Sequence, residues 1–95
     1  MNKEISLTDP LLMNLIMDLW ETVGSKILTE QNLMPEFKKS ENLDEYHFGL
    51  GLFLRNNFLG ADSELFKKFK EHGIQTNDEM STVIISTWHS ALQQE

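Results

Sequence analysis

The chain has 95 residues, the size of one domain, and no cysteine, which excludes disulfide bonds, thiolate chemistry and cysteine-based zinc sites. Its 15 acidic and 8 basic residues give a net charge of −7, which opposes binding to the phosphate backbone of nucleic acids. Such a charge attracts a basic partner, although solubility alone is the simpler explanation for it.

No stretch of the sequence approaches the ~20 apolar residues that a membrane-spanning helix requires. The first residues, Met1 to Glu4, lack the basic character of a secretion signal, and the apolar segment after them is interrupted by Asn14 and Asp18. A secreted domain of this size usually contains disulfide bonds. We therefore expect a cytoplasmic protein that does not bind membranes.

A first helix is predicted to begin at Thr8-Asp9-Pro10, where a capping residue precedes a proline whose missing N–H costs nothing. Gly24 is expected to loosen or end this helix. Before and after Gly24, apolar residues recur at steps of three and four and form one broad helical face: Leu12, Leu15, Ile16, Leu19, Trp20, Val23 and Ile27.

The segment from Ser25 to Lys39 carries a weaker signal. Thr29 is expected to cap a short turn over residues 30–34. Pro35 is expected to interrupt that turn, because the residue before a proline avoids the helical region. Residues 36–40 are then expected to form a polar connection.

A second long helix is predicted to begin with Ser40 as its cap. Acidic residues fill its early turns, where the helix dipole favours them: Glu41, Asp44 and Glu45. Two neighbouring apolar stripes follow, with Leu43, Tyr46, Leu50, Phe53 and Leu54 on one and Phe48, Leu52 and Leu59 on the other. A helix that is apolar over so much of its circumference is expected to lie at the centre of the fold, with another helix crossing closely at Gly49 and Gly51.

Gly60 is expected to end that helix, and a short third helix is predicted from Asp62 or Ser63 through His72, with Gly73 as its left-handed terminator. The last helix is predicted to begin at Thr76, which has the spacing of a capping box with Glu79. The β-branched residues 82–85 would also suit a strand, but the helical spacing around them favours a helix.

These elements predict an all-α fold, a compact bundle of four to five short helices that forms a single helical domain over residues 1–95. Its expected core contains one or two large apolar residues from each long helix: Leu15, Leu19, Leu50, Phe53, Phe66, Phe69, Ile84 and Trp88.

No catalytic motif is recognisable in the sequence. The adjacent acids Asp44-Glu45 and Asp78-Glu79 point about 100° apart on a helix and lie in predicted first turns, where capping and the dipole explain them. The segment Gly49-Leu50-Gly51 lacks the remaining features of a phosphate-binding loop. The three histidines, His47, His72 and His89, have no second set of ligands at a spacing that predicts a metal site. We expect no enzymatic activity, no metal and no cofactor.

One polar cluster, Arg55-Asn56-Asn57, is not explained by helix formation. Arg55 is the only arginine in the chain, and a guanidinium suits a planar partner such as a carboxylate. We favour an internal tie, in which Arg55 or Asn56 bonds Asp78 or Glu79 or caps a helix end. The alternative is an exposed recognition site for a carboxylate, a phosphate or the backbone of another molecule.

The segment Phe48-Gly49-Leu50-Gly51, followed by Arg55-Asn56-Asn57, resembles the signature of a small bacterial domain family of unknown function. The segment Asp78-Glu79-Met80-Ser81 resembles the family's second block, Pro-Asp-Asp-Met-Ser, and the resemblance extends over about residues 46–92. It implies that Arg55, Asn56, Asp78 and Ser81 meet in space, and it supplies no activity.

This chain departs from the family pattern at four positions. Asn77 stands where the pattern has proline, Glu79 where it has aspartate, Phe58 where it has tryptophan and Ser90 where it has arginine. Such departures are easier to accept in a structural motif than in a catalytic one. They weigh against the cluster being an active site.

Three functions follow as hypotheses. The first is a small acidic protein-binding module, such as an inhibitor or immunity-type protein that neutralises a basic partner, for example a nuclease toxin. The second is a structural or regulatory homo-oligomer. The third, which we favour least, is a small-ligand binder or enzyme with Arg55, Asn56, His47 and His89 around a cleft. The candidate site, whether binding or structural, comprises Arg55, Asn56, Asn57, Asp78, Glu79 and Ser81.

Overall fold

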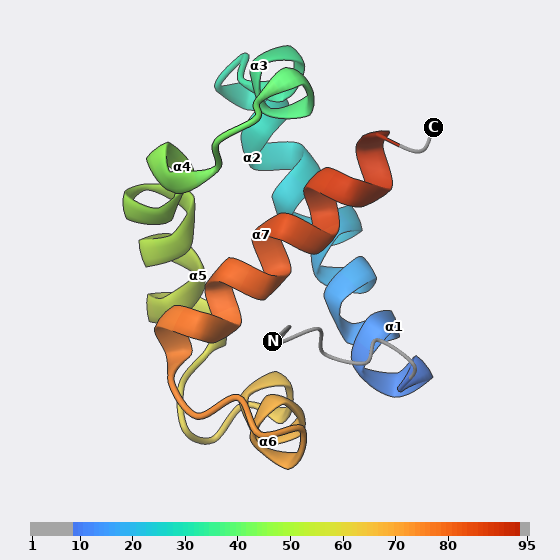
Figure 1. The fold of residues 1–95 in the computed structure, drawn as a ribbon, viewed down its shortest axis with the longest axis vertical. Coiled ribbons are helices and arrows are strands. Elements are labelled where there is room, and N and C mark those ends of the chain that lie inside the picture. Colours follow the sequence, from blue (N-terminus) through green and yellow to red (C-terminus); the bar gives the residue numbers. More distant parts are fainter. Residues whose placement is uncertain (1–8, 94–95) are drawn as a thin grey trace.

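A long rod made of three successive helical segments begins the fold. The computed structural model describes residues 9–93, apart from the side chain of His47. The rod comprises α1 (Pro10–Leu19), a π-helical segment η1 (Trp20–Gly24) and α2 (Ser25–Glu30) (Figure 1). Asp9 caps it, since its carboxylate accepts hydrogen bonds from the N–H groups of Leu11 at 2.9 Å and Leu12 at 3.4 Å. Of the predicted start, Thr8 lies outside the described residues.

The helix does not end at Gly24, which is the last residue of the π-helical segment before the geometry returns to α. It ends at Glu30, and Asn32 follows with a left-handed φ of 58° that allows the N–H of Leu33 to donate to the Leu28 carbonyl at 2.8 Å. The expected loosening at Gly24 thus corresponds to the π-helical segment, whereas the left-handed Asn32 was not predicted. Thr29 was expected to cap a new turn, but it lies in the last turn of α2.

The expectation of a polar connection at residues 36–40 was wrong. The segment forms α3 (Met34–Lys39), in which Pro35 lies in the first turn and Phe37 is fully buried. A proline at this position needs no hydrogen-bond acceptor for its nitrogen, so it begins a helix instead of breaking one.

The second long helix is divided at Gly49 into α4 (Asp44–Phe48) and α5 (Leu50–Phe58). Ser40 does not cap it. The Ser40 hydroxyl donates to the Asn42 carbonyl, and the Asn42 side chain accepts from the N–H of Asp44 at 2.9 Å. The helix begins three residues later than expected, at Asp44 and not at Glu41, after a short turn.

The C-terminal half follows the prediction closely. Helix α6 (Glu64–Glu71) is capped by the Ser63 hydroxyl, which accepts from the N–H of Phe66 at 3.0 Å. Gly73 follows with a φ of 85°. The last helix, α7 (Asn77–Gln93), begins after Thr76, whose hydroxyl accepts from the N–H of Glu79 at 3.2 Å.

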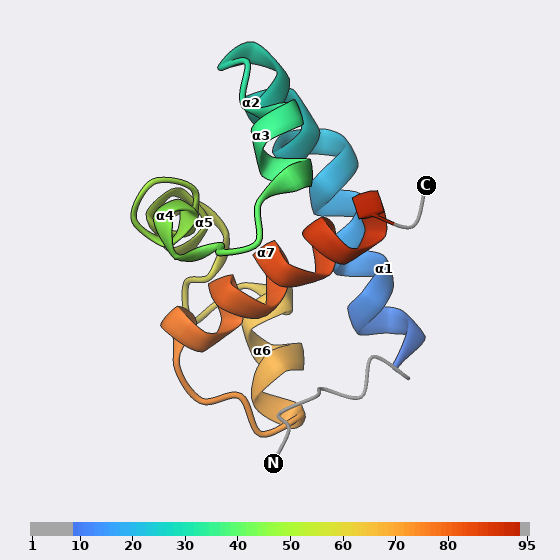
Figure 2. The same cartoon turned by 45° about the horizontal axis from the view of Figure 1, so that its top comes forward.

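Helix α7 is the centre of the fold, and not the helix around Leu50. It crosses the rod and packs against α1, α3, α4, α5 and α6 (Figures 1 and 2). Helices α4 and α5 lie to one side and bury only the face that meets α7. Phe48, Leu52 and Phe53 are therefore 79, 49 and 37% exposed, which corrects the expected central position and removes Phe53 from the core.

The all-α prediction is confirmed for residues 9–93, which contain no strand. If the rod and the α4–α5 pair are each counted as one helical unit, the described segments form five units: the rod, α3, the α4–α5 pair, α6 and α7. Among the expected core residues, Leu19, Leu50, Phe69, Ile84 and Trp88 are buried, whereas Leu15 and Phe66 are half-buried. No helix within the described range is long and apolar enough to cross a membrane.

Two tryptophans join the rod to α7. The ring centroids of Trp20 and Trp88 are 5.3 Å apart, and the Trp88 indole N–H donates to the Ile16 carbonyl at 3.0 Å. A Cβ atom at Gly24 would lie 2.8 Å from the Trp88 ring and 2.9 Å from the Trp20 ring. The glycine is required because both rings rest on its backbone.

Candidate functional site

Arg55 reaches from α5 across to the first turns of α7. Its Nη1 donates to the Ser81 hydroxyl at 3.1 Å, and its Nε lies 3.3 Å from the Asp78 carboxylate. Ser81 in turn donates to the Asp78 carbonyl at 2.9 Å. The guanidinium lies over Gly51, where a Cβ atom would be 3.0 Å from Nη1. The same Cβ atom would lie 3.6 Å from the Ser81 hydroxyl, so the close approach of another helix that we expected at the two glycines occurs at Gly51, where α7 lies beside it. Gly49 has no atom within 4 Å of such a Cβ.

The exposed fractions of the three side chains show whether this contact can bind another molecule. The Arg55 side chain is 14% exposed and Ser81 is fully buried, whereas the Asp78 side chain is 70% exposed. The guanidinium therefore has little surface left for another molecule. The geometry is that of an internal tie between α5 and α7, as we favoured from the sequence.

The other members of the candidate cluster do not join this tie. Asn56 is exposed, and the Asn57 amide donates to the Phe53 carbonyl within its own helix at 2.9 Å. Glu79 contributes its backbone N–H to the cap of α7. The structure brings together Arg55, Asp78 and Ser81, and it leaves Asn56 and Asn57 outside.

The two histidines whose side chains are described, His72 and His89, do not surround a common cleft with Arg55. His89 lies against the Phe37 ring, with centroids 5.6 Å apart, and is eight residues, or about 12 Å of helix rise, beyond Ser81 on α7. His72 bonds the Asp9 carboxylate. The side chain of His47 lies outside the described part. Among the described residues, no three histidine, aspartate or glutamate side chains are grouped to hold a metal.

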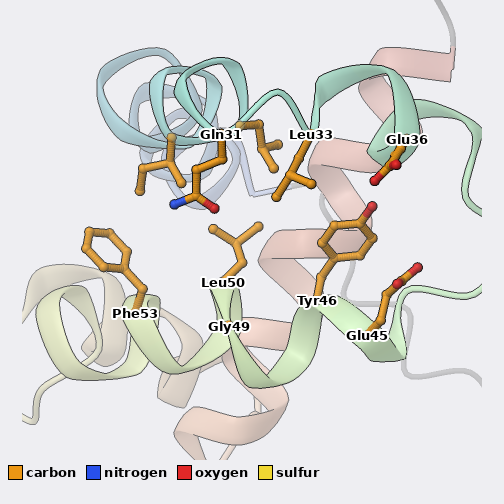
Figure 3. A pocket seen from close by; sticks show the side chains of 10 residues that line it. Gln31, Leu33, Glu36, Glu45, Tyr46, Gly49, Leu50 and Phe53 are labelled. Atoms are coloured by element: carbon orange, nitrogen blue, oxygen red, sulfur yellow. The ribbon is translucent and has the colours of Figure 1, made fainter.

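A hollow in the described structure lies elsewhere, between two walls of helices. One wall is the end of α2 with α3, and the other is α4 with the start of α5 (Figure 3). We call this hollow the α2–α5 groove. Its volume is about 530 Å³, and it is lined by Ile27, Leu28, Gln31, Leu33, Glu36, Glu45, Tyr46, Gly49, Leu50 and Phe53.

The α2–α5 groove has an apolar end and an acidic end. Leu50 and Phe53 point into it at the apolar end, while the carboxylates of Glu36 and Glu45 lie near the Tyr46 hydroxyl at the other (Figure 3). Burial is the main cause that raises the pKa of the Tyr46 hydroxyl, and the negative charges of Glu45 and Glu36 raise the pKa further. The groove thus presents a neutral hydroxyl and two exposed carboxylates beside an apolar surface.

The sequence analysis did not find this groove. Glu36 was placed in a polar connection, and Glu45 was explained by the helix dipole. The two apolar stripes of the second long helix were a usable signal for an open apolar surface. A domain of this size buries only part of its apolar surface, so exposure of one stripe could have been anticipated.

The fold and its polar tie define a small all-α domain without a recognisable catalytic centre in its described part. The chain belongs to the family described as a domain of unknown function (DUF6794), which matches residues 19–92. No curated protein and no solved structure matches it. The expected membership of a family of unknown function agrees with this match. The matched region contains the Arg55 tie and both walls of the α2–α5 groove.

Proposed function

We propose that this chain is a small acidic module that binds a basic protein partner. The observation that carries the proposal is the α2–α5 groove, whose lining combines an apolar surface with the carboxylates of Glu36 and Glu45. Interfaces of this kind take their specificity from charge and part of their affinity from apolar contacts. The net charge of −7 adds long-range attraction for a positively charged surface.

An inhibitor or immunity-type protein is the particular case that we favour. A protein of this kind covers the basic active site of its target, such as a nuclease toxin, and needs no catalytic residues of its own. The small size of the chain and the internal role of its only arginine support this case, since neither suggests a reaction.

The direct test is purification of partners from the native host on the immobilised chain at low salt, together with co-expression with the product of the adjacent gene. We expect a basic protein to be retained and then released as salt rises, because screening weakens charge attraction. The purified partner should bind the chain again in isolation. Retention of no protein at low salt would refute the proposal.

A structural homo-oligomer is the second candidate, and one observation favours it. Leu11, Phe48 and Leu52 are 58, 79 and 49% exposed, which is unusual for three large apolar residues in so small a domain. The like charge of two copies opposes their association, so we place this candidate second.

A further inference from the structure

We infer that the α2–α5 groove receives a basic amphipathic segment of the partner, which inserts an apolar side chain beside a lysine or arginine. This inference rests on the proposed function and gives it a location. It assigns the apolar side chain to the end near Leu50 and Phe53, and the cation to the end near Glu36 and Glu45.

The size and lining of the groove suit an inserted side chain. Its volume of about 530 Å³ lies within the roughly 300–1,000 Å³ of typical binding pockets. Five of its lining residues are aliphatic or phenylalanine: Ile27, Leu28, Leu33, Leu50 and Phe53. The Gln31 amide lies between Phe53 and Leu50 (Figure 3). The two walls meet where the Phe37 ring of α3 packs on the Tyr46 ring of α4, with centroids 5.0 Å apart. Beside this contact the space between the walls is open to a third element (Figure 3).

The charges at the other end select the sign of the occupant. The described residues that line the groove include Glu36 and Glu45 but no lysine or arginine. Both glutamates are exposed, so they attract a cation without first losing their hydration. The hydroxyl of Tyr46 between them offers a further acceptor for an ammonium or guanidinium group.

The same charges disfavour the other occupants. A nucleic acid would bring phosphates to the two carboxylates, and a second copy of this chain would bring a net charge of −7. Basic amphipathic helices commonly bind in apolar grooves with acidic rims. A basic partner segment therefore satisfies both ends of the groove at once.

Gly49 allows the groove to be closed without disturbing the core. It lines the groove, has a right-handed backbone with φ −85° and ψ −72°, and a Cβ atom there would meet no atom within 4 Å. Gly49→Phe places a ring in the open space. Gly49→Ala is its matched control, because a single methyl group leaves most of the volume free.

The probe is a short fluorescent peptide of leucine and lysine at helical spacing, and its control is the same peptide with glutamate in place of lysine. We expect the lysine peptide to bind the wild-type chain and the glutamate peptide to remain free. Gly49→Phe should weaken binding by roughly tenfold or more, while Gly49→Ala changes it by less than about twofold.

A double variant tests the acidic end. Glu36→Gln with Glu45→Gln should weaken binding of the lysine peptide by about fivefold, the effect of losing two modest ion pairs. Asp62→Asn with Glu64→Gln removes the same charge from exposed positions away from the groove and should cost less than about twofold. If Gly49→Phe fails to fold by circular dichroism, this pair of double variants decides the matter.

The outcomes separate the groove from the proposed function. If the lysine peptide binds but all four variants bind it equally, the groove assignment is wrong and the basic-partner proposal stands. If the lysine peptide binds no better than the glutamate peptide, the groove assignment is wrong, and the basic-partner proposal is then decided by the purification of partners at low salt. A wild-type dimer that Gly49→Phe dissociates in sedimentation experiments would assign the groove to a second copy and overturn the inference.

Discussion

Gly24 lies in a crowded environment and Gly49 in an open one. Gly24 is buried under the Trp20 and Trp88 rings, where an added Cβ atom would lie within 2.9 Å of both. Gly49 faces open space and has a backbone conformation that alanine adopts easily. The same substitution should therefore change stability in opposite directions at the two positions.

We expect Gly24→Ala to lower the free energy of unfolding by about 1–3 kcal/mol, because a well-packed interior resists an added methyl group. Gly49→Ala should raise it by about 0.4–1 kcal/mol, since it restricts the unfolded chain without creating strain. Urea unfolding followed by circular dichroism measures both. A loss of stability in Gly49→Ala, or none in Gly24→Ala, would contradict these surroundings.

The two partners of Arg55, Ser81 and Asp78, should contribute differently to the free energy of unfolding. Ser81 is buried and accepts a charge-assisted hydrogen bond, whereas Asp78 is mostly exposed. Exposed ion pairs contribute little, and a buried polar group that loses its partner is expensive.

Ser81→Ala is therefore expected to lower the free energy of unfolding by about 1–3 kcal/mol, and Asp78→Asn by at most about 1 kcal/mol. Denaturant unfolding of the two variants provides the comparison. A double-mutant cycle of Ser81→Ala with Arg55→Met should show a coupling of about 1 kcal/mol. Strict additivity would mean that the Arg55 tie is energetically unimportant.

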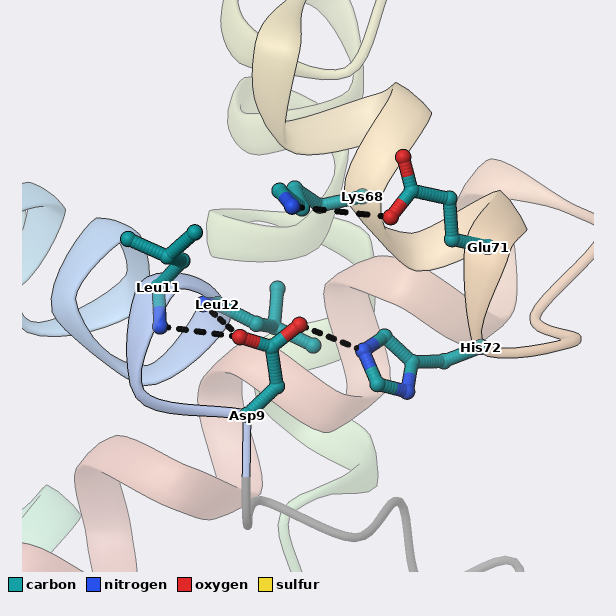
Figure 4. Close-up of polar contacts among 6 residues, drawn as sticks. All are labelled: Asp9, Leu11, Leu12, Lys68, Glu71 and His72. Atoms are coloured by element: carbon teal, nitrogen blue, oxygen red, sulfur yellow. Dashed lines mark hydrogen bonds and ion pairs between the residues drawn. The ribbon is translucent and has the colours of Figure 1, made fainter.

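At the scale of the elements, one contact joins the start of the rod to the end of α6. Asp9, which caps α1, also bonds the His72 ring at the C-terminal end of α6, with 2.8 Å between Oδ2 and Nε2 (Figure 4). The hydrogen bond from His72 is the main cause that lowers the pKa of Asp9 below its ordinary value of 3.8. The N–H groups of Leu11 and Leu12 lower that pKa further, and burial opposes them.

A carboxyl group whose pKa is lower in the folded state stabilises the protein when it is ionised. The stability that Asp9 contributes should thus be complete above pH 3.8 and disappear as the pH falls through its lower folded pKa. We expect Asp9→Asn to lower the urea midpoint near neutral pH, and the difference from the wild type to vanish in strong acid.

Glu71→Gln is the control for this titration. Glu71 pairs with Lys68 on the surface of the same helix at 3.5 Å, an exposed contact that should contribute little at any pH. If Glu71→Gln and Asp9→Asn change the acid dependence equally, the link between α1 and α6 does not have the role that we assign to it.

The elements also show where sequence reasoning is reliable. The caps of α1, α6 and α7 depend on residues within four positions of each other, so their patterns predicted them. Helix α3 was missed because Pro35 suits either a break or a first turn, and the burial of Phe37 against the Tyr46 and His89 rings selects the second. That selection depends on residues distant in sequence.

For the whole molecule, charge and exposed apolar surface point to different partners. A net charge of −7 keeps copies apart and attracts a basic protein, while the exposed side chains of Phe48 and Leu52 favour association of any kind. Phe48 ends α4 and Leu52 lies in the first turn of α5, and we call these two exposed side chains the apolar patch.

We expect the isolated chain to be a monomer of 11.0 kDa at tens of micromolar, because the like charges outweigh so small an apolar patch. Light scattering coupled to size-exclusion chromatography measures the mass. A dimer that Leu52→Glu dissociates, while Glu64→Gln leaves it intact, would support the homo-oligomer instead.

The all-α class, most helix boundaries of the C-terminal half and the pairing of Arg55 with the start of α7 could be predicted from the sequence. The fold class and the helix boundaries depend on the spacing of nearby residues. The pairing depends on the few carboxylates that a single arginine can reach. The resemblance to a family of unknown function grouped the same residues. Whether Arg55 was buried could not be predicted, because burial depends on how α5 lies against α7.

Only the tertiary structure decided which helix is central and where an open site remains. The sequence shows that the second long helix has more apolar surface than one face can bury, but it does not show which side stays exposed. Packing of α7 against both the rod and α4–α5 determines that, and it leaves the α2–α5 groove between α2–α3 and α4–α5 (Figure 3). Glu36 and Glu45 become neighbours through this packing, since residues of separate helices meet only when the whole chain has folded.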